Sequence, residues 1–214
     1  KNAAVRAKKA GFDGVEIHGA NTYLLQHFYS GHSNVREDRY GGDLEKRMTF
    51  IDEVTDAIIE ATSDESFIIG YRLSPEEIED NGITLQDTEY LVDKLNAKNL
   101  DYIHLSLRHY AQKSMRDETV EIPVTSRLKS RLRTDLPLIV SGDIHTSEDL
   151  MHAGKLGGDF FALGTALLAD PFAGETLKAK GDVDRTFKKD TLPENLYNRL
   201  KKNEHAFKHK GYGF

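Results

Sequence analysis

Five short apolar runs recur along the chain and alternate with segments whose apolar residues have helical spacing. The runs cover residues 14–18, 67–73, 102–107, 138–141 and 160–164. Each run is rich in Ile, Val, Leu, Phe or Tyr and is almost continuously apolar, which is typical of strands buried on both faces of a parallel sheet. The pattern therefore predicts repeated strand–helix units and an α/β fold.

The segments between these runs predict amphipathic helices. Apolar residues repeat at helical spacing over 44–58, directly after Asp43, which is a candidate N-cap. Thr84 begins a further helix with a sequence that resembles a capping box. Residues 124–132 predict another helix, and Ser147 is the predicted cap of the helix before the last strand.

Repeated strand–helix units fit either a doubly wound sheet or a (β/α)8 barrel, and periodicity alone does not separate the two. A complete barrel has eight units and typically about 250 residues. This chain has 214 residues and five predicted strands, and it opens inside a helical pattern. We infer a barrel that lacks about three N-terminal units. We expect its barrel part to cover residues 1–174 and a C-terminal helical tail to cover 175–214.

Composition excludes several classes of protein. The net charge of −6 argues against nucleic-acid binding, and the lysines of the tail fit a solvated helix better than a nucleic-acid patch. No run of about 18 apolar residues predicts a membrane span. The absence of cysteine excludes disulfides and fits a reducing compartment, so we expect a cytoplasmic protein. His104 and His109 have no acidic neighbours at ligand spacing, and we expect no metal site.

Three polar side chains follow the first predicted strand within six residues. His18 ends the strand, and Asn21 and Tyr23 follow a Gly-Ala turn. An imidazole N–H and an amide N–H that share one ligand oxygen would stabilise negative charge there, each by about 3 kcal/mol in a water-excluded site. A phenol, with an ordinary pKa of about 10, is a proton donor at neutral pH. The alternatives are a capping histidine, a turn asparagine and a packed tyrosine.

Other strand ends suggest a site for an anion. Arg72 ends an otherwise apolar strand, where a ligand or a carboxylate on a neighbouring strand would have to balance its charge. Ser141-Gly142 and Gly164-Thr165 end the last two strands, and the last two strand–helix loops of a barrel frequently bind phosphate. Either loop alone also fits an ordinary turn.

The motifs resemble those of the Old Yellow Enzyme family of FMN-dependent ene-reductases and NAD(P)H:flavin oxidoreductases. The resemblance rests on GVEIHGAN at 14–21, on residues 23–24, 34–42 and 47, on YRLSP at 71–75, on SGDI at 141–144 and on ALGTALLADP at 162–171. It covers roughly residues 3–173. It implies a (β/α)8 barrel, of which this chain would be the C-terminal five units, with FMN as cofactor and NADH or NADPH as reductant.

The resemblance also implies roles for individual residues. His18 and Asn21 would hold a substrate oxygen, and Tyr23 would donate a proton to an activated alkene. Arg72 would meet the pyrimidine edge of the flavin, while Ser141, Gly142, Gly164 and Thr165 would lie at the FMN phosphate. Departures from the family pattern are Thr165 in place of an arginine, Thr22 in place of a glycine and Gly31 in place of a proline. The iron–sulfur cysteines of the dienoyl-CoA reductase branch are missing.

Three functions follow from these observations. The leading hypothesis is an FMN-dependent NAD(P)H oxidoreductase that acts on small molecules with an activated alkene or carbonyl. A flavin-free, phosphate-binding lyase or isomerase would also explain both glycine loops, but no strand end shows a clear Schiff-base lysine. A non-catalytic flavin-binding relic is the third hypothesis, and Thr165 favours it. The sequence leaves open whether the protein forms a homo-oligomer.

Overall fold

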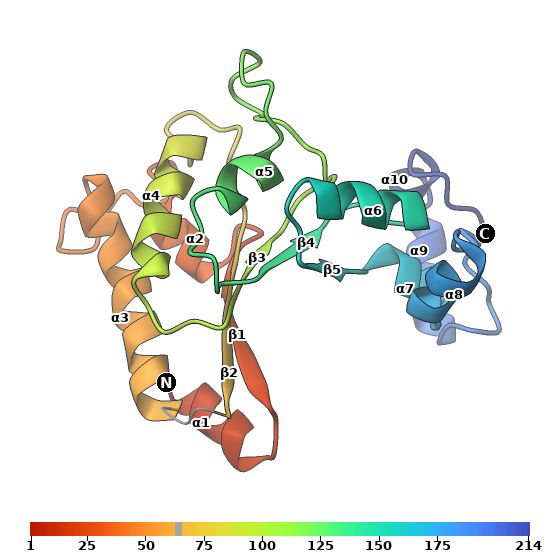
Figure 1. Ribbon diagram of the computed structural model, residues 1–214, viewed down its shortest axis with the longest axis horizontal. Helices are drawn as coiled ribbons and strands as arrows, with labels where there is room; N and C mark the ends of the chain where they lie inside the picture. Colours follow the sequence, from red (N-terminus) through yellow and green to blue (C-terminus); the bar gives the residue numbers. More distant parts are fainter. Residues whose placement is uncertain (63–65) are drawn as a thin grey trace.

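Five parallel strands form one sheet in the order in which they occur in the chain (Figure 1). The structure, a computed structural model, describes residues 1–62 and 66–214. The strands are β1 (Gly14–Gly19), β2 (Ile68–Leu73), β3 (Tyr102–Leu105), β4 (Leu138–Ser141) and β5 (Phe160–Ala162). All five predicted strands are confirmed, although β3 and β5 each end two residues earlier than expected.

Helices connect the strands and continue beyond the last one. They are α1 (Asn2–Lys9), α2 (Leu24–Tyr29), α3 (Leu44–Thr62), α4 (Leu85–Asn96), α5 (Val124–Lys129), α6 (Ser147–Lys155), α7 (Thr165–Ala169), α8 (Ala173–Lys180), α9 (Glu194–Lys202) and α10 (His205–Lys208). Within the two described ranges, no helix is both long and apolar enough to cross a membrane.

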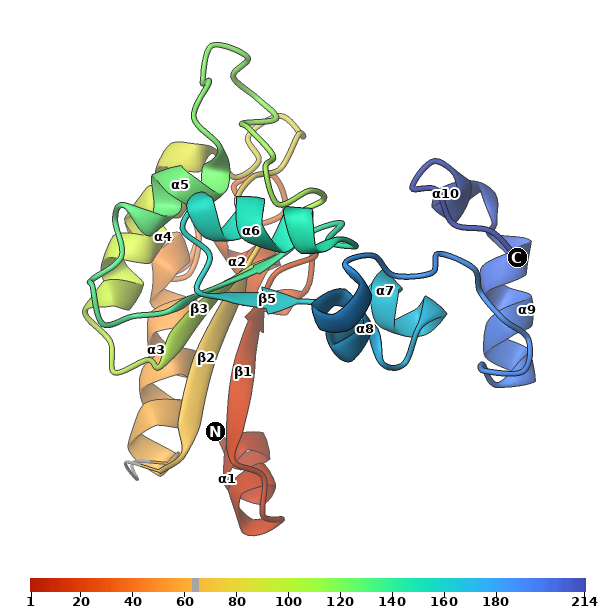
Figure 2. The ribbon, with the colours of Figure 1, turned by 45° about the vertical axis from the view of Figure 1, so that its right-hand side comes forward.

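The strand order separates the two folds that periodicity left open. A doubly wound sheet reverses its strand order at a switch point, whereas a barrel adds each new strand beside the previous one. Here every strand pairs in parallel with the next one along the chain, from β1 to β5. The helices α3, α4 and α5 lie on one side of the strands in both Figure 1 and Figure 2. The sheet is therefore a five-unit part of a (β/α)8 barrel.

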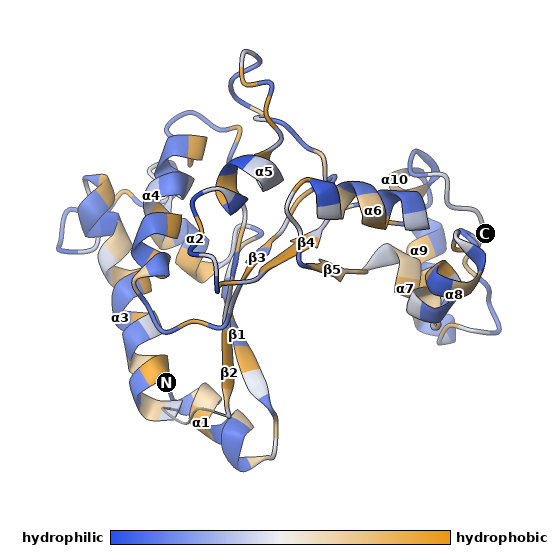
Figure 3. Ribbon diagram, viewed as in Figure 1, coloured by the Kyte–Doolittle hydropathy of each residue, from blue (hydrophilic) through white to orange (hydrophobic). Residues whose placement is uncertain are grey.

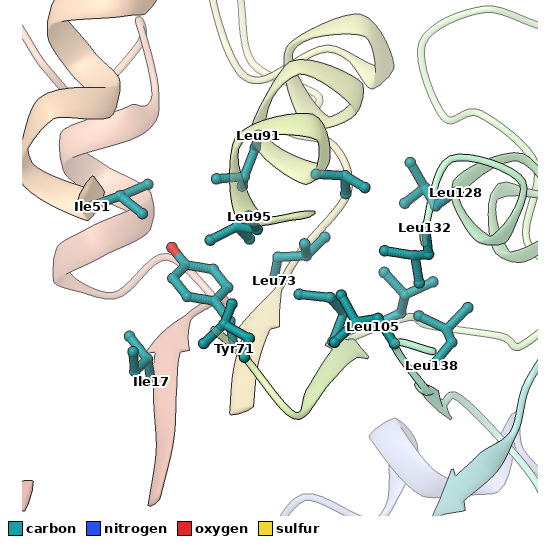
Figure 4. Packing of buried hydrophobic residues seen from close by; sticks show 14 of the residues in the cluster. Ile17, Ile51, Tyr71, Leu73, Leu91, Leu95, Leu105, Leu128, Leu132 and Leu138 are labelled. Carbon is teal, nitrogen blue, oxygen red and sulfur yellow. The ribbon is translucent and has the colours of Figure 1, made fainter. Parts of the chain in front are cut away.

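One face of the sheet is packed against these helices. Tyr71 and Leu73 of β2 and Leu105 of β3 are fully buried there, beside residues of α3, α4 and α5 such as Ile51, Leu95 and Leu128 (Figure 4). Figure 3 shows mostly apolar residues along the strands and many polar residues along the helices. Because side chains alternate along a strand, the residues between these apolar ones face the interior of the barrel.

Side-chain caps begin several of the helices. The predicted caps Asp43 and Thr84 are confirmed, since the Lys46 N–H donates to Asp43 at 2.9 Å and Thr84 forms a capping box with Asp87. The predicted cap Ser147 is wrong by one residue. Thr146 has the extended backbone of an N-cap and accepts from the Asp149 N–H, whereas the Ser147 hydroxyl donates to the Leu177 carbonyl at 2.6 Å.

Two further predicted boundaries concern the end of one helix, which differs in the structure, and the start of the tail, which stays untested. Helix α5 ends at Lys129 rather than at 132, because the chain continues in tight turns from Ser130. The predicted boundary between barrel and tail, after residue 174, falls within α8 and stays a prediction. Helices α7 to α10 lie beyond β5 in both views (Figures 1 and 2), with a small apolar cluster of their own that includes Phe187, Leu200 and Tyr212.

The packing predicts a large penalty for a cavity under β3. Leu105→Ala should lower the free energy of unfolding by about 2–5 kcal/mol, because the Leu105 side chain is fully buried between sheet and helices. Met151→Ala is the matched control, since Met151 is 62% exposed on α6 and should cost no more than about 0.5 kcal/mol. Urea unfolding measures both, and equal penalties would contradict this view of the core.

Candidate active site

The three residues predicted to act together lie at the C-terminal end of β1. His18 is the fifth residue of the strand, and Tyr23 is the residue that precedes α2. Both are exposed, and their rings lie 5.3 Å apart, centroid to centroid. Asn21 lies in the turn between them. The structure thus brings His18, Asn21 and Tyr23 together, whereas their chemical roles stay predictions.

The turn that carries Asn21 has an unusual backbone. Asn21 and Thr22 have φ angles of 57° and 59°, in the left-handed region. Asparagine adopts this region more readily than most residues, but a β-branched threonine is strained there. Two hydrogen bonds hold the turn: Asn21 N–H donates to Ser74 Oγ at 2.9 Å, and Thr22 N–H donates to Gln26 Oε1 at 3.0 Å. Strain maintained in this way is common at functional sites.

A chain of hydrogen bonds joins the ends of β1, β2 and β3. Arg72 Nη2 donates to Ser106 Oγ at 2.9 Å, and Ser106 Oγ donates to Asn21 Oδ1 at 2.9 Å. The amide oxygen of Asn21 is therefore engaged, and its N–H2 group is the end that remains to donate to a ligand. No sequence motif includes Ser106. Its only sequence signal is its place directly after β3.

Arg72 has an unsatisfied donor. The expected alternative was a salt bridge to a carboxylate on a neighbouring strand, but the described part of the chain contains no such ion pair within 4 Å. The Nε atom of Arg72 is buried and has no hydrogen-bond partner among the described residues. A buried donor without a partner costs about 1–3 kcal/mol, so this atom favours a ligand that accepts from it.

The loops after β4 and β5 each contain a glycine, but the surroundings of these two glycines differ. Gly142 has a φ of 132°, and a Cβ there would lie 2.9 Å from backbone atoms of His109 and Tyr110, so only glycine fits. Gly164 has open space around it, with nothing within 4 Å of a Cβ. Thr165 begins α7, which has only 5 residues and offers no strong helix dipole. The Ser141 hydroxyl is already engaged, because it donates to the Leu105 carbonyl at 2.8 Å.

One pocket is lined by all five residues that were predicted to bind a cofactor. Its walls include Arg72, Ser141, Gly142, Gly164 and Thr165, contributed by the ends of β2, β4 and β5. A second pocket adjoins it through shared wall residues at the end of β3, Ser106 among them, and includes Asn21. His18 and Tyr23 line neither of these two pockets. The five predicted cofactor residues thus share one pocket, while His18 and Tyr23 lie exposed outside both pockets.

A hydrogen bond between a carboxylate and an imidazole lies on the interior face of the strands, close to Arg72. His104 Nδ1 is 2.8 Å from a carboxylate oxygen of Glu16, which is 88 residues away in the sequence. Burial opposes ionisation of Glu16, but the hydrogen bond and charge of His104, a hydrogen bond from Tyr102 and the charge of Arg72 lower the pKa of this carboxyl below its ordinary value. Burial and the Glu16 carboxylate in turn raise the pKa of Tyr102 to about 12.

Sequence reasoning missed Glu16, because the partner strand that brings His104 to it cannot be seen from local spacing. His104 itself is buried. The described ranges contain no group of three or more His, Cys, Asp or Glu residues that could hold a metal ion.

Known flavin oxidoreductases are similar to this chain in sequence. A family sequence model described as NADH:flavin oxidoreductase / NADH oxidase matches residues 1–182. A probable NADH-dependent flavin oxidoreductase of Bacillus subtilis is 44% identical over 172 residues, which are 79% of this chain and 46% of that protein. An NADH:acrylate oxidoreductase of Vibrio harveyi is 43% identical over 79% of this chain and 18% of its own length.

Solved structures with the same fold also have longer chains than this one. Morphinone reductase in complex with tetrahydroNAD has a TM-score of 0.69 and 28% identity, over 85% of this chain and 47% of that one. The old yellow enzyme homologue from Zymomonas mobilis has a TM-score of 0.69 and 25% identity, over 85% of this chain and 51% of that one. The chain therefore spans about half the length of several proteins that it matches.

The Glu16–His104 pair predicts a pH-dependent contribution to stability. The pKa of Glu16 is lower in the folded chain than in the unfolded one. Its ionised form therefore stabilises the fold above about pH 4.3, the ordinary value for a glutamate, and this contribution is lost as the pH falls through the lower folded pKa. Glu16→Gln should thus be less stable than wild type at pH 7, and the difference should shrink toward pH 3.

Urea unfolding of both proteins at several pH values measures this difference. Glu37→Gln is the matched control, because Glu37 is exposed and its change should have little effect at any pH. A gap between wild type and Glu16→Gln that stays constant down to pH 3 would show that the carboxylate charge contributes nothing.

Proposed function

Because this chain belongs to the NADH:flavin oxidoreductase / NADH oxidase family, we propose that the whole protein is an FMN-dependent oxidoreductase that reduces activated alkenes with electrons from NAD(P)H. Membership of this family identifies FMN and NAD(P)H as its cofactors. The observation that carries the proposal is the pocket at the ends of β2, β4 and β5, in which Arg72 has a buried donor without a partner.

The residues present fit FMN. The unpartnered Nε of Arg72 would donate to the pyrimidine edge of the flavin, where an arginine stabilises the negative charge of the reduced ring. Gly164 leaves its backbone open to a phosphate, since nothing lies within 4 Å of the Cβ position there, whereas Gly142 is required by the close approach of the His109 and Tyr110 backbone. When bound, FMN supplies the hydride chemistry, which the side chains of this protein cannot perform themselves.

Asn21 and His18 would bind and polarise the substrate. The hydrogen bond from Ser106 engages the Asn21 amide oxygen and leaves its N–H2 group to donate to a carbonyl or carboxylate oxygen of the substrate. An imidazole N–H of His18 would donate to the same oxygen. Two donors on one oxygen stabilise the negative charge that develops there when a hydride adds to the conjugated carbon–carbon double bond.

Tyr23 would complete the reduction. A hydride adds to the β-carbon of the alkene, and the Tyr23 hydroxyl then gives its proton to the α-carbon, so that one hydride and one proton convert the double bond to a single bond. The tyrosine is 63% exposed, which leaves its hydroxyl accessible to a substrate and to water for reprotonation. Its ring lies beside His18, so both groups reach the same substrate.

The names of relatives support the substrate class. Acrylate and fumarate, named in the relatives from Vibrio harveyi and Klebsiella pneumoniae, are alkenes conjugated to a carboxylate. We propose the same class here, with the carboxylate or carbonyl oxygen at Asn21 and His18. We also propose a cytoplasmic location, because a chain without cysteine fits a reducing compartment.

The first test is the flavin itself. The full-length protein should purify with the yellow absorbance of bound FMN and should oxidise NAD(P)H when an activated alkene is supplied. A full-length protein that takes up no FMN would contradict the proposed function. FMN binding without any NAD(P)H oxidation would instead support the flavin-binding relic.

The second test separates the two half-reactions. Tyr23→Phe should slow alkene reduction by about 100-fold or more, because it removes the proton donor, and should leave flavin reduction by NAD(P)H within about twofold of wild type. Tyr90→Phe, on the outer helix α4, is the matched control and should change neither step. Stopped-flow absorbance follows both half-reactions. Equal loss in both would show that Tyr23 is not the proton donor.

A further inference from the structure

The pocket at β4 and β5 has one wall residue from a distant part of the chain. Lys210 lies after α10, near the C-terminal end of the sequence, and lines the same pocket as Gly142, Gly164 and Thr165. Its Nζ is 3.2 Å from the Asp143 carboxylate, in the loop after β4. No sequence pattern pointed to this residue, because it is separated from the pocket loops by most of the tail.

The C-terminal tail is anchored beside this pocket. Tyr212 and His145 are both buried, and Tyr212 Oη is 2.7 Å from His145 Nδ1. His145 Nε2 is 3.0 Å from Asp143. A carboxylate only accepts, so Nε2 carries the proton, and in the neutral ring Nδ1 accepts from the Tyr212 hydroxyl. This arrangement fixes the backbone on both sides of Gly211 and directs Lys210 at the pocket.

Charge in the pocket is unevenly distributed. Arg72 belongs to the β2 side, where it is bonded to Ser106. On the β4–β5 side the loop residues Gly142, Gly164 and Thr165 are uncharged and Asp143 is an anion. Arg108, which follows β3, also lines the pocket, and Lys210 is the cation that the tail contributes and that meets Asp143 on the β4 side. Its ammonium group has three donors, of which Asp143 engages one.

We propose that Lys210 binds the phosphate group of FMN, so that the C-terminal tail completes the cofactor site. This inference rests on the proposed function, because it assumes that FMN occupies the pocket. Asp143 holds the ammonium group at the pocket wall, and the remaining donors of Lys210 bind phosphate oxygens. The open backbone at Gly164 leaves space for the phosphate, and Lys210 supplies the charge that the loops after β4 and β5 lack.

The competing explanation is that Lys210 only attaches the tail to Asp143. Lys210 is not part of the apolar cluster of the tail, and its side chain is 31% exposed, so its replacement leaves that cluster intact. Asp143→Asn breaks the same ion pair from the other side. Asparagine suits the φ of 57° at this position, and it removes a negative charge that opposes a phosphate.

The test is a titration of the full-length protein, freed of flavin, with FMN and with riboflavin, which lacks the phosphate. Lys210→Met should weaken FMN binding by about tenfold or more, the effect of losing one charge-assisted hydrogen bond, and should leave riboflavin binding within about twofold. Lys210→Arg should retain FMN affinity. Lys208→Met is the matched control, because Lys208 is ion-paired with Glu204 and does not line the pocket. Flavin fluorescence reports binding.

Each outcome decides the matter. Weakened FMN binding in Lys210→Met, with normal riboflavin binding and with normal or tighter FMN binding in Asp143→Asn, supports the phosphate contact. Equal weakening in Lys210→Met and Asp143→Asn, or a parallel loss of riboflavin, assigns Lys210 to tail attachment and overturns the inference. FMN affinity unchanged in Lys210→Met overturns it while leaving the proposed function intact. Wild-type protein that binds no FMN overturns both.

Discussion

Burial of one face of the sheet beneath α3, α4 and α5 is the constraint on which the rest of the structure depends. Tyr71, Leu73 and Leu105 pack there, and no water reaches them. Side chains alternate along a strand, so the burial of Tyr71 and Leu73 sends Arg72 to the opposite, interior face. A shift of one residue in register would bury the guanidinium among leucines. The apolar core therefore determines where the charge of the site lies.

Parallel pairing then collects polar groups from different strands. The register sets His18 beside Arg72, and Arg72 beside His104. The same alignment brings the strand ends together, where Arg72, Ser106 and Asn21 form one chain of hydrogen bonds. Such a chain restricts each member to one orientation, which is what a site must do to stabilise charge without reorganising during a reaction.

The tail connects the far end of the sequence to the same strand ends. Phe187 and Leu200 of the tail pack in an apolar cluster beyond β5, and Tyr212 and Lys210 reach the loop after β4. Two polar contacts anchor the tail at one side of the pocket, Tyr212 with His145 and Lys210 with Asp143. The state of the tail and the state of that pocket are therefore physically coupled, since releasing Tyr212 from His145 would also withdraw Lys210 from the pocket wall.

The sequence by itself determined the strands, the caps at Asp43 and Thr84, and the strand ends at which His18, Arg72 and Gly142 lie. These depend on local periodicity and local hydrogen bonds, which neighbouring residues specify. Only the tertiary structure decided the strand order, the Glu16–His104 pair, the link through Ser106 and the place of Lys210. Each of these joins residues distant along the chain, and packing of the whole sheet and tail brings them within reach of one another.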